Sequence, residues 1–186
     1  HLSIRRQRQM CIRDRYKPHL NYEILTACPT CASTFKEEYG WNIKFALVAV
    51  LDRIKEGGVK IKNNPPIKEA TYHDPCHLSR KLNITKEPRE LLSLIGIKVK
   101  EMGLNEAYSS CCGAGGGILA CELQMAKDIA KNRIVEAYET GTGNLITACP
   151  TCEPHLFRAS MQVSRETRRS GGEKRVKVFD MWSILD

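Results

Sequence analysis

Cysteines are the residues of this sequence with the greatest capacity for chemistry. The chain has nine of them among 186 residues, and no signal peptide is recognisable at its start. In a chain of this size, such a content favours metal or redox chemistry over a disulfide scaffold. Seven of the nine occur in a spaced pattern of pairs and one single residue: Cys28, Cys31, Cys76, Cys111, Cys112, Cys149 and Cys152.

Five of these thiols follow one another in the second part of the chain. Cys76 is separated by 34 residues from the adjacent pair Cys111 and Cys112, and 36 more residues precede Cys149 and Cys152. Thiols from three segments can hold a metal cluster, and the glycine-rich residues 113–117 leave backbone N–H groups free to approach sulfur. Structural zinc, which usually takes two short cysteine pairs, and a strained vicinal disulfide remain alternatives.

Strands and helices alternate in the expected secondary structure. Short apolar or β-branched segments at 22–27, 70–73, 97–102 and 144–148 predict strands, and helices are predicted around 47–54, 88–95 and 118–140. The alternation predicts an α/β fold with mainly parallel sheets. The cysteine pairs then fall at the carboxyl ends of strands, where such sheets place their ligand sites.

An internal repeat organises the chain. Residues 24–31 and 145–152 share the string Thr-Ala-Cys-Pro-Thr-Cys, and residues 45–52 resemble residues 179–186 in their apolar pattern. We therefore expect two tandem pseudo-repeats truncated at both ends, with residues 16–66 as the C-terminal part of the first and 67–186 as a nearly complete second. Residues 1–15 resemble a translated sequencing adapter, or else form a disordered arm, and are left out of the fold.

The apolar runs and the charge distribution of the sequence argue against a membrane or a nucleic acid as a direct partner. The longest apolar run is residues 45–51, which is too short to span a membrane. The net charge is +8, but half of it lies in residues 1–15, and the basic residues of 165–177 have no interleaved aromatic side chains. We expect this second basic segment to be a solvated loop, and we expect no nucleic-acid partner.

The cysteine pattern resembles the cysteine-rich CCG domain. The resemblance lies in Cys76, in Cys111-Cys112-Gly113, in Cys149-Pro150-Thr151-Cys152 and in the flanking residues 72–78 and 111–117, and it extends over roughly residues 20–186. CCG domains occur in the B-type and D-type subunits of heterodisulfide reductases, and in iron–sulfur subunits of glycolate, lactate and glycerol-3-phosphate oxidising enzymes. The resemblance implies two Rossmann-like CCG copies and a [4Fe–4S] cluster of the non-cubane type.

The same resemblance implies the site residues. The cluster ligands would be Cys76, Cys111, Cys112, Cys149 and Cys152, whereas Cys28 and Cys31 would need further cysteines of the first copy. His73 and His77 flank Cys76, and we expect both either to orient the loop or bond to sulfur, or simply to cap the local backbone. His77 is also a weaker candidate for a proton donor in disulfide cleavage. Four other side chains are expected to be structural: Cys121, Trp41 and Trp182 by packing, and His155 on a helix surface.

Three functions are compatible with this interpretation. The first is a heterodisulfide-reductase-like oxidoreductase subunit that receives electrons from a flavin- or ferredoxin-type subunit and cleaves a small disulfide. The second is an electron-transfer subunit of a flavin-dependent 2-hydroxy-acid or glycerol-3-phosphate dehydrogenase. The third is a zinc-stabilised interaction module. For the redox functions we expect a cytoplasmic hetero-oligomer that meets a membrane only through a partner.

Overall fold

The strands of the protein pair in parallel throughout the part of the chain that the structure describes. The computed structural model describes residues 10–11, 14–15, 21–59, 65–172 and 174–185. One sheet joins β1 (Ile24–Thr26) to β2 (Ile43–Phe45), and a four-stranded sheet has the order β4-β3-β5-β6. The members of the second sheet are β3 (Glu69–His73), β4 (Lys98–Val99), β5 (Asn144–Thr147) and β6 (Lys177–Asp180). The prediction of an α/β fold with parallel sheets is confirmed.

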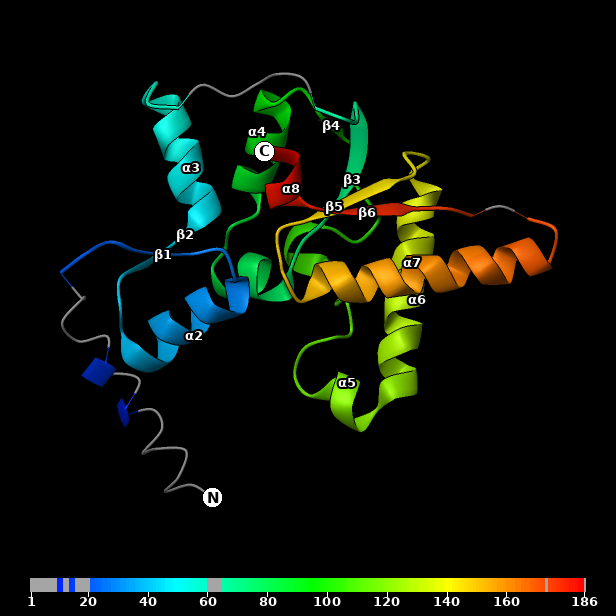
Figure 1. Ribbon diagram of the computed structural model, residues 1–186, viewed down its shortest axis with the longest axis horizontal. Helices are drawn as coiled ribbons and strands as arrows, with labels where there is room; N and C mark the ends of the chain where they lie inside the picture. The colour runs from blue at the N-terminus through cyan, green and yellow to red at the C-terminus, as the bar shows by residue number, and fades with distance from the viewer. Residues whose placement is uncertain (1–9, 12–13, 16–20, 60–64, 173, 186) are drawn as a thin grey trace.

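Helices connect these strands and cover both faces of the larger sheet (Figure 1). The longer helices are α2 (Pro29–Tyr39), α3 (Ala46–Lys55), α4 (Lys86–Leu94), α6 (Leu123–Glu139) and α7 (Cys152–Arg169). The short ones are η2 (His77–Lys81), η3 (Glu106–Tyr108), α5 (Ile118–Cys121) and α8 (Met181–Leu185). None of the helices in the described part of the chain has the length and apolar character needed to cross a membrane.

Two hydrophobic clusters hold the helices to the sheet. Side chains that alternate along a strand point to opposite faces, so on β5 Ile146 packs into one cluster and Leu145 into the other. The first cluster joins the sheet to α3, α4 and α8, and the second joins it to α6 and α7. Figure 1 shows α4 and α8 on one side of the strands and α6 and α7 on the other.

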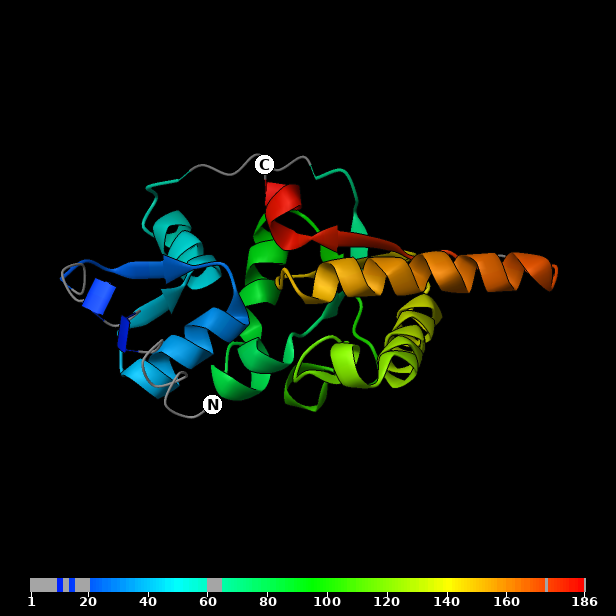
Figure 2. The same ribbon diagram turned by 60° about the horizontal axis from the view of Figure 1, so that its bottom comes forward.

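The same order of elements occurs twice along the chain. A strand, a helix, a parallel strand and a helix follow one another as β1–α2–β2–α3 and again as β5–α7–β6–α8. In each case the first strand leads into a Cys-Pro-Thr-Cys segment, so the helix that follows begins among cysteines. Figure 2 shows that α2 lies beside the short helix η2, which follows β3.

Three predicted elements differ from the observed ones. The helix expected at 118–140 is interrupted at Glu122 (φ −135°, ψ 65°), and Leu123, which follows the break, remains 51% exposed. The strand expected at 97–102 is reduced to β4. The basic residues Arg165, Arg168 and Arg169 lie in the final turns of α7 rather than in a loop, where the negative end of the helix dipole favours cations.

Candidate metal centre

Three strands of the parallel sheets deliver cysteines at their carboxyl ends. After β3, Asp74 and Pro75 lead to Cys76, which stands at the start of η2. After β5 come Cys149 and then Cys152, the first residue of α7. After β1 comes Cys28, whose sulfur caps α2 by accepting the backbone N–H of Cys31 at 3.5 Å. The structure therefore shows the predicted placement for Cys76 and for the pairs Cys28/Cys31 and Cys149/Cys152, whereas the pair Cys111 and Cys112 lies in a loop well beyond β4 and not at a strand end.

A glycine turn brings in the adjacent pair Cys111 and Cys112. Gly113, which follows them, has a φ of +85°, and a Cβ atom at this position would lie 2.6 Å from the carbonyl oxygen of Ala126 on α6. Only glycine allows both the left-handed backbone and this close approach. The Gly113 N–H donates to Cys111 Sγ at 3.3 Å, so the turn also supplies a backbone donor to sulfur.

One cavity collects all seven cysteines of the spaced pattern. Its volume is about 270 Å³, and its walls come from the β1–α2 turn, the β3–η2 turn, the glycine loop and the β5–α7 turn. The cysteines that line it are Cys28, Cys31, Cys76, Cys111, Cys112, Cys149 and Cys152. Cys112, Cys149 and Cys152 are buried, and Cys76 and Cys111 are half-buried.

Each of the five thiols of the second part of the chain shifts the pKa of the next, in the order Cys76, Cys111, Cys112, Cys152 and Cys149, and we call them the five linked thiols. A hydrogen bond from Cys112, and a second from Cys76, hold the pKa of Cys111 far below its usual value. The same contacts with Cys111 raise the pKa of Cys76 and raise that of Cys112 to about 11.

The chain of thiols continues to the start of α7. The Cys152 thiol and the backbone N–H groups of Cys152 and Thr151 lower the pKa of Cys149 to about 6, whereas hydrogen bonds with Cys112 and Cys149 raise that of Cys152. Thiolates are the form of cysteine that binds metal, and metal binding releases the protons of such groups. Five thiols that line one cavity, with backbone donors beside them, fit an iron–sulfur cluster better than a four-ligand zinc site.

The first pair, Cys28 and Cys31, faces the same five sulfurs. Burial, the neighbouring Cys28 and the nearby Cys149 all raise the pKa of Cys31. The sequence pattern assigned Cys28 and Cys31 to a separate copy of the repeat. The structure brings them to the wall of the cavity that the other five line.

A buried ion pair supports the turn that carries Cys76. The carboxylate of Asp74 is 1% exposed and accepts two hydrogen bonds from the guanidinium of Arg89 on α4, at 2.8 and 2.9 Å. It also accepts the backbone N–H of Glu106 in η3 at 2.8 Å. Arg80 of η2 donates to the carbonyl oxygen of Ser109 at 2.8 Å, so η2 is tied to the loop that leads to Cys111.

The two histidines that flank Cys76 have different surroundings. His77 lines the cavity, and its Nδ1 lies 2.7 Å from the Ser33 hydroxyl of α2. His73 is fully buried, and one of its ring nitrogens lies within 4.8 Å of the sulfurs of Cys112 and Cys152. Burial and the nearby guanidinium of Arg133 lower the pKa of His73 to about 3, so its imidazole is neutral.

Of the four residues that the sequence marked as structural, two lie where we expect them and two do not. Trp41 is buried and Trp182 packs against the first hydrophobic cluster, as expected. Cys121, expected to be packed, is exposed, because α5 ends before the buried face of α6 begins. His155, expected on a helix surface, is buried and its Nε2 lies 3.1 Å from the Ala126 carbonyl oxygen, because α6 crosses α7 there.

Sequence reasoning missed Arg133. Its side chain is completely buried, although arginine is rarely so. The signal was present in the helical spacing, because Arg133 falls among Ala126, Ala130, Ile134 and Ala137 on the face of α6 that packs inward.

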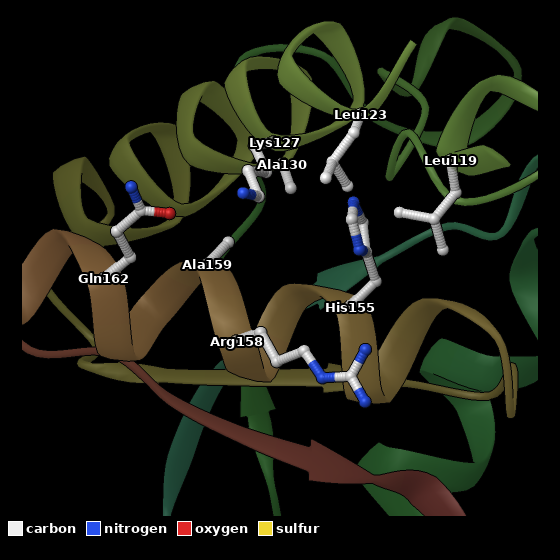
Figure 3. Close-up of a pocket in the computed structure, with 8 residues that line it drawn as sticks. All are labelled: Leu119, Leu123, Lys127, Ala130, His155, Arg158, Ala159 and Gln162. Atoms are coloured by element: carbon white, nitrogen blue, oxygen red, sulfur yellow. The ribbon is translucent and has the colours of Figure 1, made fainter. Parts of the chain in front are cut away.

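A second hollow lies between α6 and α7, apart from the cysteines (Figure 3). Its volume is about 110 Å³, and Figure 3 shows Leu119, Leu123 and His155 around it, with Lys127 and Arg158 alongside. Its lining contains neither cysteine nor carboxylate. The candidate metal centre is therefore the cysteine cavity.

Comparison with known proteins agrees with this centre. Residues 70–157, which include all five linked thiols, match the family model described as a cysteine-rich domain, CCG. The chain carries a CCG cysteine-rich domain.

The relatives of the chain include iron–sulfur oxidoreductases. An uncharacterized iron–sulfur protein of Methanocaldococcus jannaschii is 34% identical over 87% of this chain and 31% of its own length. The D-type subunit of the dihydromethanophenazine:CoB–CoM heterodisulfide reductase of Methanosarcina acetivorans is 35% identical over 73% of this chain and 35% of its own length. An EtfAB:quinone oxidoreductase of Syntrophomonas wolfei is 27% identical over 88% of this chain and 23% of its own length. The chain thus spans about a third of the length of the first two relatives.

Proposed function

We propose that the CCG domain holds a [4Fe–4S] cluster of the non-cubane type and that the chain is part of a redox subunit that reduces a disulfide. The ligands would be Cys76, Cys111, Cys112, Cys149 and Cys152. The observation that carries this proposal is the convergence of these five thiols, from three separate segments of the chain, on one cavity. A cubane cluster takes four cysteine ligands, so a fifth thiolate in the same set favours the non-cubane type.

The reaction would consume two electrons and two protons and convert one disulfide into two thiols. When bound, an iron–sulfur cluster supplies electrons one at a time. The protein's own residues provide the cavity, and the Ser33 hydroxyl holds the imidazole of His77 at its wall. His77 is the proposed donor of a proton to a departing thiolate.

The electrons would come from a flavin- or ferredoxin-type subunit in a hetero-oligomer. The support for a partner is that the relatives include a subunit of a heterodisulfide reductase and an EtfAB:quinone oxidoreductase. The disulfide substrate is supported by the heterodisulfide reductase, which is the more similar of these two. We expect the complex to work in the cytoplasm.

A second candidate is an electron-transfer subunit that never touches substrate. The similarity to a quinone oxidoreductase favours it, because the same five thiols would then serve only to carry electrons from a flavoprotein toward a quinone. The hydroxy-acid or glycerol-3-phosphate substrate would be bound by the partner. The zinc-stabilised module is the least compatible with five linked thiols.

An assay of disulfide reduction separates these candidates. The chain is reconstituted with iron and sulfide without oxygen and supplied with electrons by reduced methyl viologen. Oxidation of the dye is followed after addition of the CoB–CoM heterodisulfide or of a quinone analogue. We expect heterodisulfide-dependent oxidation in the native chain and in Cys121→Ser, whose thiol is exposed and outside the cavity, and its loss in Cys76→Ser.

Other outcomes contradict the first candidate. Oxidation of the dye by the quinone analogue alone would favour the electron-transfer subunit. Binding of one zinc ion without any sulfide would contradict both redox functions.

A further inference from the structure

A buried histidine–arginine pair lies directly behind the cysteine site. His73 ends β3 and Arg133 lies on α6, and both side chains are excluded from solvent. The Arg133 Nε–H donates to His73 Nδ1 at 3.1 Å. The proposed function assigns no role to either residue. A ring nitrogen of His73 nevertheless lies within 4.8 Å of the sulfurs of Cys112 and Cys152.

Other hydrogen bonds fix the orientation of the Arg133 guanidinium, so that its Nε–H faces His73. Its Nη1 donates to the Leu104 carbonyl oxygen at 2.8 Å and to Glu136 at 2.7 Å, and its Nη2 donates to the Ser109 hydroxyl at 3.0 Å. The Nε–H therefore remains for His73. A guanidinium has five N–H donors and no acceptor, so the nitrogen that faces it must offer a lone pair.

This requirement fixes the tautomer of His73. A neutral imidazole has one ring nitrogen that accepts and one that carries the proton. Because Nδ1 accepts from Arg133, the proton must be on Nε2. Nε2 is buried and has no hydrogen-bond partner among the described residues, and a buried donor without a partner is costly.

We propose that Arg133 holds His73 as the Nε2–H tautomer, so that His73 donates a hydrogen bond to a sulfur of the cysteine site and is not itself a metal ligand. The acceptor would be Cys112 Sγ, Cys152 Sγ or a sulfur of the bound cluster. A metal-binding nitrogen needs its lone pair, and the proton on Nε2 occupies that position. The identity of the acceptor sulfur in the cluster-loaded protein depends on the proposed function, whereas the assignment of the tautomer does not.

The expected consequence is a tuned reduction potential. A hydrogen bond to sulfur stabilises the more electron-rich, reduced form of an iron–sulfur cluster and so raises its potential. His73 would supply this donor in a buried environment, where hydrogen bonds are strong. Arg133 would act only through His73, as a positioning residue.

Nuclear magnetic resonance of the chain labelled with ¹⁵N-histidine and prepared without metal tests the tautomer directly. We expect the His73 Nε2 resonance in the range of a protonated ring nitrogen and Nδ1 in the range of an unprotonated one, unchanged between pH 6 and pH 8. In Arg133→Met, which keeps an unbranched apolar stem but removes the guanidinium donors, the two nitrogens are expected to shift toward a mixture of tautomers. A proton on Nδ1 of the native chain would overturn the proposal.

Potentiometric titration of the reconstituted chain tests the donor role. His73→Phe is expected to keep the native iron and sulfide content but to lower the reduction potential, and His73→Gln, which retains an N–H donor, is expected to restore part of the shift. Loss of iron in His73→Phe with full retention of fold by circular dichroism would show instead that His73 is a ligand. Failure of the native chain to take up iron and sulfide would contradict the proposed function, and the tautomer measurement would still stand.

Discussion

Arg89→Met is expected to destabilise the protein strongly, because it leaves the Asp74 carboxylate buried without its cation. Asp74 is 1% exposed and Arg89 16% exposed, and the two are joined by paired hydrogen bonds. Removal of one partner of a buried ion pair costs about 3–5 kcal/mol. We expect a value near the lower end, about 3 kcal/mol, because the Glu106 N–H still donates to Asp74.

The neighbouring residue on α4 provides the matched control. Glu90 forms an ion pair with Lys55 at 2.7 Å, but its side chain is 43% exposed. An exposed pair contributes about 0–1 kcal/mol, so Glu90→Gln should change the free energy of unfolding by less than about 1 kcal/mol. Arg89→Met also removes the ion pair of Arg89 with Glu101, whose side chain is 38% exposed, whereas Glu90→Gln removes only the pair with Lys55. Since the exposed Glu101 pair contributes about 0–1 kcal/mol, the buried charge of Asp74 is the principal difference between the two variants.

Urea-induced unfolding, followed by circular dichroism at 222 nm, measures these free energies. The double variant Asp74→Asn/Arg89→Met removes the unpaired charge and keeps an acceptor for the Glu106 N–H, so it should be more stable than Arg89→Met alone. The reasoning is refuted if Glu90→Gln costs as much as Arg89→Met, or if the second substitution destabilises Arg89→Met further.

Two other predictions concern the glycine loop and pH. Gly113→Ala should cost at least about 2 kcal/mol in urea unfolding, because its Cβ would meet the Ala126 carbonyl oxygen, whereas Gly115→Ala, with open space around it, should be close to neutral; equal losses would contradict this. Burial raises the pKa of Asp180 above its ordinary value of 3.8, so the folded state holds this proton more tightly and stability falls as the pH rises through that window. Asp180→Asn should therefore gain stability relative to the native chain as the pH rises above about 4, and a difference that does not change with pH would contradict the assignment.

The positions of the cysteines could be predicted from the sequence because they depend on local pattern. Short apolar segments that run directly into Cys-Pro or Asp-Pro-Cys mark strand ends, and parallel strands bring their carboxyl ends to one edge. Cys76, Cys149 and Cys152 follow this logic. The approach of Cys28 and Cys31 to the same cavity could not be predicted in this way, because it depends on how α2 packs beside η2.

The errors have a common physical origin in helix packing. His155 is buried and Cys121 exposed because of where α6 crosses α7 and where the helix breaks at Glu122, and neither can be read from apolar periodicity alone. Arg133 was missed because a buried arginine is explained only by its partners, and these come from three other segments of the chain or from its own helix.

Analysis of iron and acid-labile sulfide, with low-temperature electron paramagnetic resonance, tests most directly whether the five linked thiols hold a non-cubane cluster. The measurement compares the chain, reconstituted without oxygen, with Cys112→Ser and with Cys121→Ser as the control. We expect about four irons and four sulfides and a signal of the oxidised state that Cys112→Ser abolishes and Cys121→Ser retains. One tightly bound zinc ion without sulfide, or an unchanged signal in Cys112→Ser, would contradict the claim.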